Sequence, residues 1–198
     1  SSNSHIIYDT MKRIMDVSVA IFFGLFTLIF YPFVMLAIFF EDRGRSFIAQ
    51  ERVGKGGRRF KLVKFRSMTR NEDRGGWVGE TDNKITGVGK FLRKSRIDEF
   101  PQLWNVLKGD LSLIGPRPDI IGNFETLSRE VPYYTIRNVV KPGLSGWAQT
   151  HQDIVPQSIE ETKERLAYDL YYIKNRSFIL DIKIALQTIK TLLSRVGK

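Results

Sequence analysis

The chain has 198 residues, of which 42% are hydrophobic, so it is long enough for one domain with a buried core and too short for two. Its 31 Lys and Arg against 21 Asp and Glu give a formal charge of +10, which points to anionic partners: nucleic acid, anionic lipid head groups or phosphorylated substrates. The absence of cysteine excludes disulfides, thiolate catalysis and cysteine-ligated zinc, and two histidines leave little scope for histidine chemistry.

The N-terminal part of the chain contains one long uncharged segment. We expect residues 1–10 to be a flexible tail and draw no functional argument from them. From Val17 to Phe40 the chain then runs 24 residues without a formal charge, which as a straight helix would reach roughly 36 Å and cross a bilayer. Apolar residues occur all round this helix, which favours burial in lipid. Pro32 should bend it, because proline lacks the backbone donor and clashes with the preceding turn.

Basic residues lie on both sides of this segment, including Lys12 and Arg13 before it and Arg43 after it. A simple span carries its positive charge mainly on one side. Together with Pro32, this symmetry favours a re-entrant membrane helix over residues 11–41, which enters and leaves the bilayer on the cytoplasmic face. A kinked single span is the alternative.

Residues 47–53 and 60–68 predict a β-hairpin, because they flank a glycine-rich turn at 54–57. The turn lacks the spacing of a phosphate-binding loop. In the second strand, Lys64 and Arg66 fall on one face, so two cations project together and could clamp phosphate oxygens. A solvated strand face is the simpler explanation.

Residues 91–107 predict helix in two pieces, because Pro101 must start or bend a helix. Asp98 and Glu99 sit at the break, where both carboxylates can converge on one ligand. Carboxylates suit Mg²⁺, whose coordination substrate phosphates commonly complete, and an aspartate can act as a covalent nucleophile. The ordinary explanation is an acidic pair that interacts with the helix dipole.

Two further loops carry candidate ligand contacts. Arg117 lies between Pro116 and Pro118, so its guanidinium is pre-organised to grip a diphosphate, although a rigid turn with an exposed arginine fits equally. Residues 141–149 combine turn formers with an aromatic and an amide, which suits either a nucleotide or sugar contact or a packed loop.

Residues 178–196 have apolar side chains at helical spacing with basic residues between them. This pattern predicts an interfacial amphipathic helix. A surface helix packed on the core is the alternative.

Taken together, these segments resemble the monotopic phosphoglycosyl transferases, the bacterial sugar transferase family that starts glycan assembly on a polyprenyl phosphate carrier. The resemblance covers about residues 11–193. It rests on four ordered motifs, which are KFRSM (64–68), LRKSRIDEFPQLWNVLKGDLSLIGPRP (92–118), VKPGLSGWAQ (140–149) and YDLYYIKNRSFILDIKI (168–184).

The resemblance implies a reaction and a set of site residues. Asp98 would be the nucleophile and Mg²⁺ ligand: it would attack the β-phosphorus of a UDP-sugar, expel UMP and hold the phosphosugar until polyprenyl (undecaprenyl) phosphate takes it. Glu99 would support metal binding or activate the acceptor. The residues here that match other positions in or around the family's active site are Lys64, Arg93, Arg117 and Asp169.

The chain departs from the family at the membrane segment. The family breaks this helix at a Ser-Pro pair, whereas the residues here are Tyr31 and Pro32. Pro32 remains the predicted break, but the serine hydroxyl that could satisfy a freed carbonyl is missing, which leaves the bend geometry open.

We therefore expect a mixed α/β, helix-rich monotopic membrane enzyme, with its catalytic domain over residues 42–198 and on the cytoplasmic side of the bacterial inner membrane. Its expected cofactor is Mg²⁺, and its expected partners are a UDP-sugar, polyprenyl phosphate and membrane phospholipids; homo-oligomers stay open. Nucleic acid is not expected, since neither zinc-finger spacing nor an RRM signature is present. The alternatives are direct transfer through a ternary complex and a non-catalytic basic adaptor that binds anionic lipid or nucleic acid.

Overall fold

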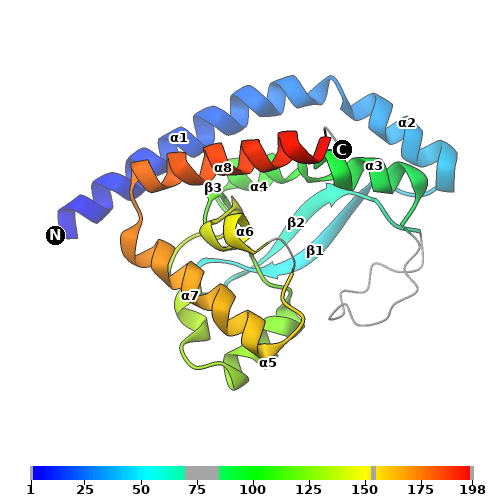
Figure 1. The fold of residues 1–198 in the computed structure, drawn as a ribbon. Coiled ribbons are helices and arrows are strands. Elements are labelled where there is room, and N and C mark those ends of the chain that lie inside the picture. Colours follow the sequence, from blue (N-terminus) through cyan, green and yellow to red (C-terminus); the bar gives the residue numbers. More distant parts are fainter. Residues whose placement is uncertain (1, 70–84, 153–154, 197–198) are drawn as a thin grey trace.

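The computed structural model describes residues 2–69, 85–152 and 155–196, most of which are helical (Figure 1). The helices are α1 (Ser2–Leu28), α2 (Tyr31–Asp42), α3 (Gly87–Ser95), α4 (Gln102–Lys108), α5 (Ile121–Glu130), α6 (Trp147–His151), α7 (Ile159–Asn175) and α8 (Phe178–Val196). Short 3₁₀ turns cover Lys55–Gly57, Ile97–Glu99 and Tyr134–Val139, and the strands are β1 (Phe47–Val53), β2 (Arg59–Phe65), β3 (Ser112–Ile114) and β4 (Gly143–Ser145). The predicted mixed α/β, helix-rich class is confirmed.

The prediction of a flexible tail at residues 1–10 is wrong for the part that the structure describes, because α1 begins at Ser2. Tyr8 is buried, and its hydroxyl donates to the Asp181 carboxylate of α8 over 2.8 Å. The Lys12 ammonium reaches the same carboxylate oxygen at 2.6 Å. These contacts with α8 hold the start of α1 in place, so the helix extends well before the apolar segment.

The predicted break near Pro32 is confirmed. Helix α1 ends at Leu28, and Pro32 lies in the first turn of α2, where its missing N–H is not needed. Near the bend the Thr27 hydroxyl donates to the Gly24 carbonyl over 3.0 Å, so a hydroxyl is present although the family's serine is not. No single helix of the described residues has the length and composition to cross a bilayer, whereas α1 from Ile6 and α2, bent by 56°, meet these criteria as a pair.

The predicted hairpin is confirmed as an antiparallel pair, β1 with β2, in which Phe47 lies opposite Phe65. Its turn uses Gly56 and Gly57, both with positive φ. Strand β2 ends at Phe65 rather than at Met68, which forms an isolated bridge with Ile85.

Both arms of the bent helix pair pack on the hairpin. One core cluster joins α1 to β2 and α4, and its buried residues are Ala20, Leu62, Val106 and Leu111. A second cluster joins α2 to β2 and α3, and its buried residues are Val34, Ile38, Phe65 and Leu92. The α1–α2 pair is therefore part of the folded unit and not a free anchor.

Strands β3 and β4 form a short parallel pair that the sequence did not predict. The pairing requires glycine, because a Cβ on Gly143 would lie 2.1 Å from the Gly115 nitrogen. Similarly, a Cβ on Gly146 would lie 2.4 Å from the Gly115 oxygen. This close backbone contact brings the loop around Arg117 beside the segment 141–149.

Large apolar side chains remain exposed on α1, α2 and α8, which run along the same side of the molecule (Figure 1). On α1, α2 and the two residues between them they include Phe22, Leu25, Phe26, Ile29, Phe33, Leu36 and Phe40, and on α8 they are Ile179, Ile182, Leu186, Ile189 and Leu193. The helix predicted at 178–196 is confirmed, and its apolar residues are largely unburied. Soluble monomers rarely expose so many large apolar side chains together.

Candidate active site

A cavity of about 530 Å³ opens between the hairpin, the turn before α4, the loop around Arg117 and the C-terminal half of α8. Its charged lining consists of six basic and two acidic side chains, which are Arg52, Lys64, Arg93, Arg96, Arg117, Arg165, Asp98 and Glu99. This excess of positive charge in a concave site suits a ligand that carries several phosphate charges. The structure thus brings together most of the predicted site residues from distant parts of the chain.

Asp98 lies in the 3₁₀ turn Ile97–Glu99, between the end of α3 and the start of α4, as its position before Pro101 predicted. Only 8% of the residue is exposed, and its Oδ1 has no hydrogen-bond partner among the described residues. Burial and the neighbouring Glu99 raise the pKa of the Asp98 carboxyl to about 6, against the opposing effect of nearby cations. At neutral pH the carboxylate is therefore mostly ionised and has a free lone pair for a cation or an electrophile.

Glu99 is adjacent to Asp98 but, unlike Asp98, forms an ion pair with Arg96. The Arg96 Nη1 lies 3.0 Å from both Glu99 carboxylate oxygens. Arg96 adopts a left-handed backbone (φ 59°) as it ends α3, and this conformation starts the turn that carries both acids. The Glu99 charge is thereby partly balanced, whereas Asp98 is left with an unpartnered oxygen.

Lys64 and Arg93 approach Asp98 from β2 and α3, and both lower the pKa of its carboxyl. The Arg93 Nε donates to the buried Ser67 hydroxyl over 2.9 Å, which orients the guanidinium. Helix α3 can lie this close to Ser67 because residue 89 is glycine: a Cβ there would lie 1.9 Å from the Ser67 carbonyl oxygen.

Arg66 does not line this cavity, so the prediction that it projects together with Lys64 is wrong. Strand β2 ends at Phe65, which interrupts the alternation of faces before Arg66. Its buried guanidinium instead pairs with Asp42 at 3.0 Å and lies over Gly44, which has no side chain to obstruct it. In this structure Arg66 joins the end of α2 to the hairpin.

Arg117 lines the cavity, whereas Asp169 lies behind it, fully buried. The link between them is Arg137, which sequence reasoning missed. Its Nη2 donates to the Arg117 carbonyl and to the Asp169 carboxylate, both over 2.8 Å, and its Nη1 pairs with Asp119. Asp169 is therefore a support for the loop that carries Arg117. No motif marked Arg137, because its partners lie 18 and 32 residues away in the chain.

Arg52 and Arg165 also line the cavity and were not predicted as site residues. Burial, reinforced by the positive charge of Arg117, lowers the pKa of Arg52 to about 10. The Nε atoms of Arg52 and Arg165 are buried without a hydrogen-bond partner among the described residues. The hairpin register could have indicated Arg52, since Arg52 lies on the same face as Lys64. The sequence around Arg165 on α7 contains no motif that indicates a site residue.

The carboxylates of the cavity fit a Mg²⁺ ion that is completed by substrate. The described residues contain no group of three or more His, Cys, Asp or Glu side chains that could hold a metal ion. Mg²⁺ usually binds through one or two carboxylates, waters and substrate phosphates. The unpartnered Oδ1 of Asp98 beside Glu99 meets this requirement.

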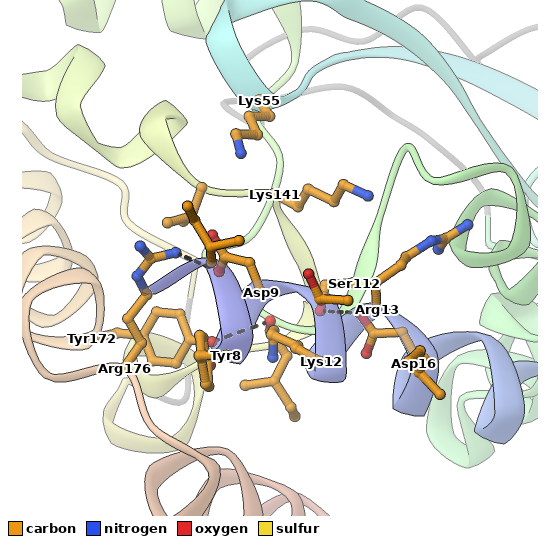
Figure 2. Close-up of a pocket in the computed structure, with 15 residues that line it drawn as sticks. Tyr8, Asp9, Lys12, Arg13, Asp16, Lys55, Ser112, Lys141, Tyr172 and Arg176 are labelled. Carbon is orange, nitrogen blue, oxygen red and sulfur yellow. Dashed lines mark hydrogen bonds and ion pairs between the residues drawn. The ribbon is translucent and has the colours of Figure 1, made fainter. Parts of the chain in front are cut away.

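A second cavity, of about 460 Å³, lies against the N-terminal half of α1 (Figure 2). It shares no lining residue with the first cavity and contains none of the predicted site residues.

Comparison with known proteins agrees with the motifs. A family model described as "Bacterial sugar transferase" matches residues 7–195. The chain is 43% identical over 194 residues to a UDP-N-acetylgalactosamine-undecaprenyl-phosphate N-acetylgalactosaminephosphotransferase of Aeromonas hydrophila, covering 96% of this chain and 45% of that protein.

Two further relatives have similar coverage of this chain. A UDP-glucose:undecaprenyl-phosphate glucose-1-phosphate transferase of Caulobacter vibrioides is 39% identical over 193 residues, which are 94% of this chain and 71% of that protein. A Bacillus subtilis protein described as "Uncharacterized sugar transferase EpsL" is 37% identical over 191 residues, 94% of this chain and 89% of that protein. The chain thus spans less than half of the Aeromonas relative but most of the other two.

Proposed function

The chain belongs to the bacterial sugar transferase family, and on that premise we propose that it transfers a sugar 1-phosphate from a UDP-sugar to polyprenyl (undecaprenyl) phosphate and releases UMP. One observation carries the proposal: the buried Asp98 carboxylate has an unpartnered oxygen in a cavity lined by six basic side chains. The named sugars of two relatives differ, N-acetylgalactosamine in one and glucose in the other, so the donor sugar stays open.

In the first proposed step, an oxygen of the Asp98 carboxylate forms a bond to the β-phosphorus of the donor. The bond between that phosphorus and the oxygen that bridges to the α-phosphate breaks, and UMP leaves with the electron pair. In the second step, a phosphate oxygen of polyprenyl phosphate attacks the same phosphorus, and the Asp98 carboxylate leaves. One phosphoanhydride is broken and one is formed, so neither a redox partner nor water is consumed.

The basic side chains hold the reacting phosphates together against their mutual repulsion. Lys64 and Arg93 lie beside Asp98, and the positive charge of each lowers the pKa of its carboxyl. Arg117 faces the cavity from the opposite loop, where Arg137 supports its backbone. Cations placed in this way stabilise charge that develops on the oxygens of a transferred phosphoryl group.

Mg²⁺ fits the same site. Asp98 and Glu99 would hold the ion together with donor phosphates, and the bound ion would neutralise charge on the diphosphate. Glu99, already paired with Arg96, would support this binding or activate the acceptor.

We further propose that α1 and α2 enter the cytoplasmic leaflet of the bacterial inner membrane as a re-entrant hairpin, with residues 42–198 facing the cytoplasm. The apolar arm from Val17 to Leu28 and helix α2 have 12 residues each, or about 18 Å, whereas a bilayer core is about 30 Å thick. The 56° bend and the packing of both arms on one hairpin support a return to the same face. Exposed apolar residues of α8 would then meet membrane phospholipids at the interface.

The experiment uses detergent-solubilised protein with Mg²⁺ and a panel of UDP-sugars, with and without undecaprenyl phosphate, and measures UMP. Acceptor-dependent UMP from one donor is expected, and it should be lost in both Asp98→Ala and the isosteric Asp98→Asn. A stoichiometric burst of UMP without acceptor, together with a phosphosugar mass adduct on Asp98, separates the covalent route from a ternary complex. Absence of UMP with every donor would instead favour the basic membrane adaptor.

A further inference from the structure

The cavity against α1 is strongly cationic. Its lining includes five basic and two acidic side chains, which are Lys12, Arg13, Lys55, Lys141, Arg176, Asp9 and Asp16. They come from α1, the hairpin turn, the start of the 141–149 segment and the end of α7, and Figure 2 shows Lys55 and Lys141 on the same side of α1. Four separate parts of the chain thus bring positive charge to one hollow.

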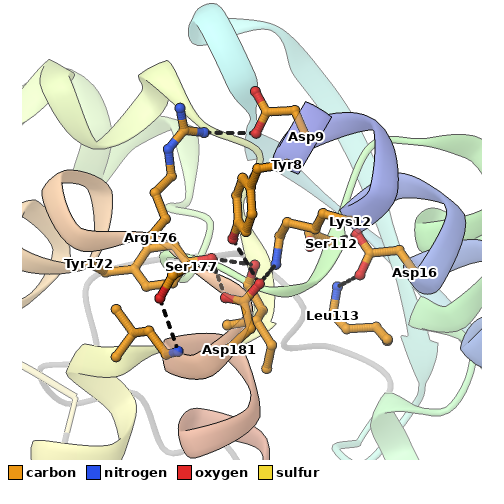
Figure 3. A network of polar contacts seen from close by, with 12 residues as sticks. Tyr8, Asp9, Lys12, Asp16, Ser112, Leu113, Tyr172, Arg176, Ser177 and Asp181 are labelled. Atoms are coloured by element: carbon orange, nitrogen blue, oxygen red, sulfur yellow. Dashed lines mark hydrogen bonds and ion pairs between the residues drawn. The ribbon is translucent and has the colours of Figure 1, made fainter. Parts of the chain in front are cut away.

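Three of these cations already have fixed partners. The Lys12 ammonium binds Asp181 of the network shown in Figure 3, and Arg176 pairs with Asp9 at 3.0 Å. The guanidinium of Arg13 donates to the carbonyls of Val106 and Leu107 at the end of α4. These contacts set the shape of the hollow, because they hold α1 against α4, α7 and α8.

Lys55 and Lys141 differ, because neither forms an ion pair with a carboxylate of the described residues. The Lys141 ammonium and the Arg13 guanidinium both approach Gly109. A Cβ added to Gly109 would lie 3.6 Å from the Lys141 Nζ and 3.5 Å from the Arg13 Nη2. Burial, with the charges of Arg13 and Lys55, lowers the pKa of Lys141 against the opposing effect of the Asp16 and Asp110 carboxylates. Cations held together in this way repel one another unless an anion lies between them.

The cavity also has an apolar border. Ile6 and Ile14 of α1 line it, and each is 61% exposed. A small inorganic anion would satisfy the lysines but leave these side chains in water. An amphiphile with an anionic head and an apolar tail would cover both kinds of surface.

We propose that this cavity binds the phosphate of a membrane lipid headgroup between Lys55 and Lys141, beside the charge of Arg13, with the lipid tail along the exposed isoleucines of α1. The site is separate from the Asp98 cavity. It rests on the membrane attachment proposed above but does not require the transfer reaction. A lipid held there would fix the start of α1 at the membrane interface, next to the point where the helix enters the apolar phase.

The test measures lipid binding in the full chain carrying Asp98→Ala, so that failure of the reaction cannot affect the result. Protein in a neutral detergent is titrated with short-chain phosphatidylglycerol, with farnesyl phosphate and with inorganic phosphate, and the thermal midpoint is followed. We expect a saturable rise with at least one lipid, and the tighter one names the lipid class.

Two double variants that each remove two positive charges distinguish lipid binding at this cavity from general electrostatic attraction. Lys55→Gln with Lys141→Gln should weaken lipid binding roughly tenfold or more, because two charge-assisted contacts are lost. Lys61→Gln with Lys163→Gln removes the same charge from exposed positions outside both cavities and should bind as the parent does. If the first pair does not fold, Lys55→Gln alone, in the exposed turn, should give a smaller loss. Equal affinity of the two double variants, or inorganic phosphate binding as tightly as lipid, would overturn the proposal.

Discussion

Replacing Asp98 by asparagine should stabilise the protein at alkaline pH. The folded state raises the pKa of this carboxyl to about 6 from an ordinary value of 3.8, chiefly through burial. Between these two values the folded state binds more protons than the unfolded state, so the free energy of unfolding falls as pH rises through about 4 to 6. A difference of about 2 pKa units corresponds to about 3 kcal/mol, which is the stability lost once Asp98 is ionised.

Asparagine has the same shape and no charge, so Asp98→Asn mimics the protonated acid at every pH. The variant should exceed the parent in free energy of unfolding by up to about 3 kcal/mol at pH 8. The advantage should shrink towards zero near pH 4, where the parent is protonated. Urea titrations in one detergent at both pH values measure the difference, with Glu164→Gln on the exposed face of α7 as the control for loss of a carboxylate.

Two results would refute the prediction for Asp98→Asn. A variant that is less stable than the parent at pH 8, or an advantage that does not change with pH, would mean that burial does not destabilise the Asp98 carboxylate. The nearby cations would then outweigh burial, contrary to the balance argued here.

Four further predictions concern activity and folding. UMP release should fall tenfold per pH unit well below pH 6, because the proposed nucleophile must be ionised, and a pH profile at saturating donor measures this. Chelation by EDTA should abolish release and added Mg²⁺ should restore it. Arg137→Met should lower the free energy of unfolding by about 3–5 kcal/mol, because it leaves the buried Asp169 carboxylate without its ion-pair partner and also breaks the ion pair with the partly buried Asp119, as denaturant titration can show. Gly143→Ala should lower the free energy of unfolding by about 1–3 kcal/mol and reduce UMP release. Gly122→Ala, with open space around the added methyl, should do neither.

Each of these predictions has a contrary outcome. A flat profile between pH 5 and 8 would argue against an Asp98 nucleophile, and full activity in EDTA would remove Mg²⁺ from the proposal. Parent-like stability of the Arg137 variant would mean that its two carboxylates find other partners. Equal effects at Gly143 and Gly122 would show that the close β3–β4 contact is not what requires glycine.

The correct predictions depended on local features of the chain. The turn at 54–57 selects a hairpin, and Pro32 interrupts a long helix because it has no backbone N–H to donate. Asp98 and Glu99 could be placed before a helix start because Pro101 suits that position. In each case a few adjacent residues restrict the backbone enough to decide the outcome.

The errors arose where a tertiary partner decided a side chain's position. Arg66 follows the end of β2 and pairs with Asp42 at the end of α2, so strand alternation placed it wrongly. Tyr8 was assigned to a tail because nothing nearby in sequence shows its contact with Asp181, 173 residues away.

By itself, the sequence determined the family, the helix break, the hairpin and the acidic turn that carries Asp98, since short-range sterics and ordered motifs specify all of these. Only the tertiary structure decided that Arg52 and Arg165 join the predicted cations around that aspartate, how Arg137 supports the Arg117 loop, and that a second cationic cavity forms against α1. These features depend on contacts between residues far apart in the chain, whose mutual distances no local pattern records.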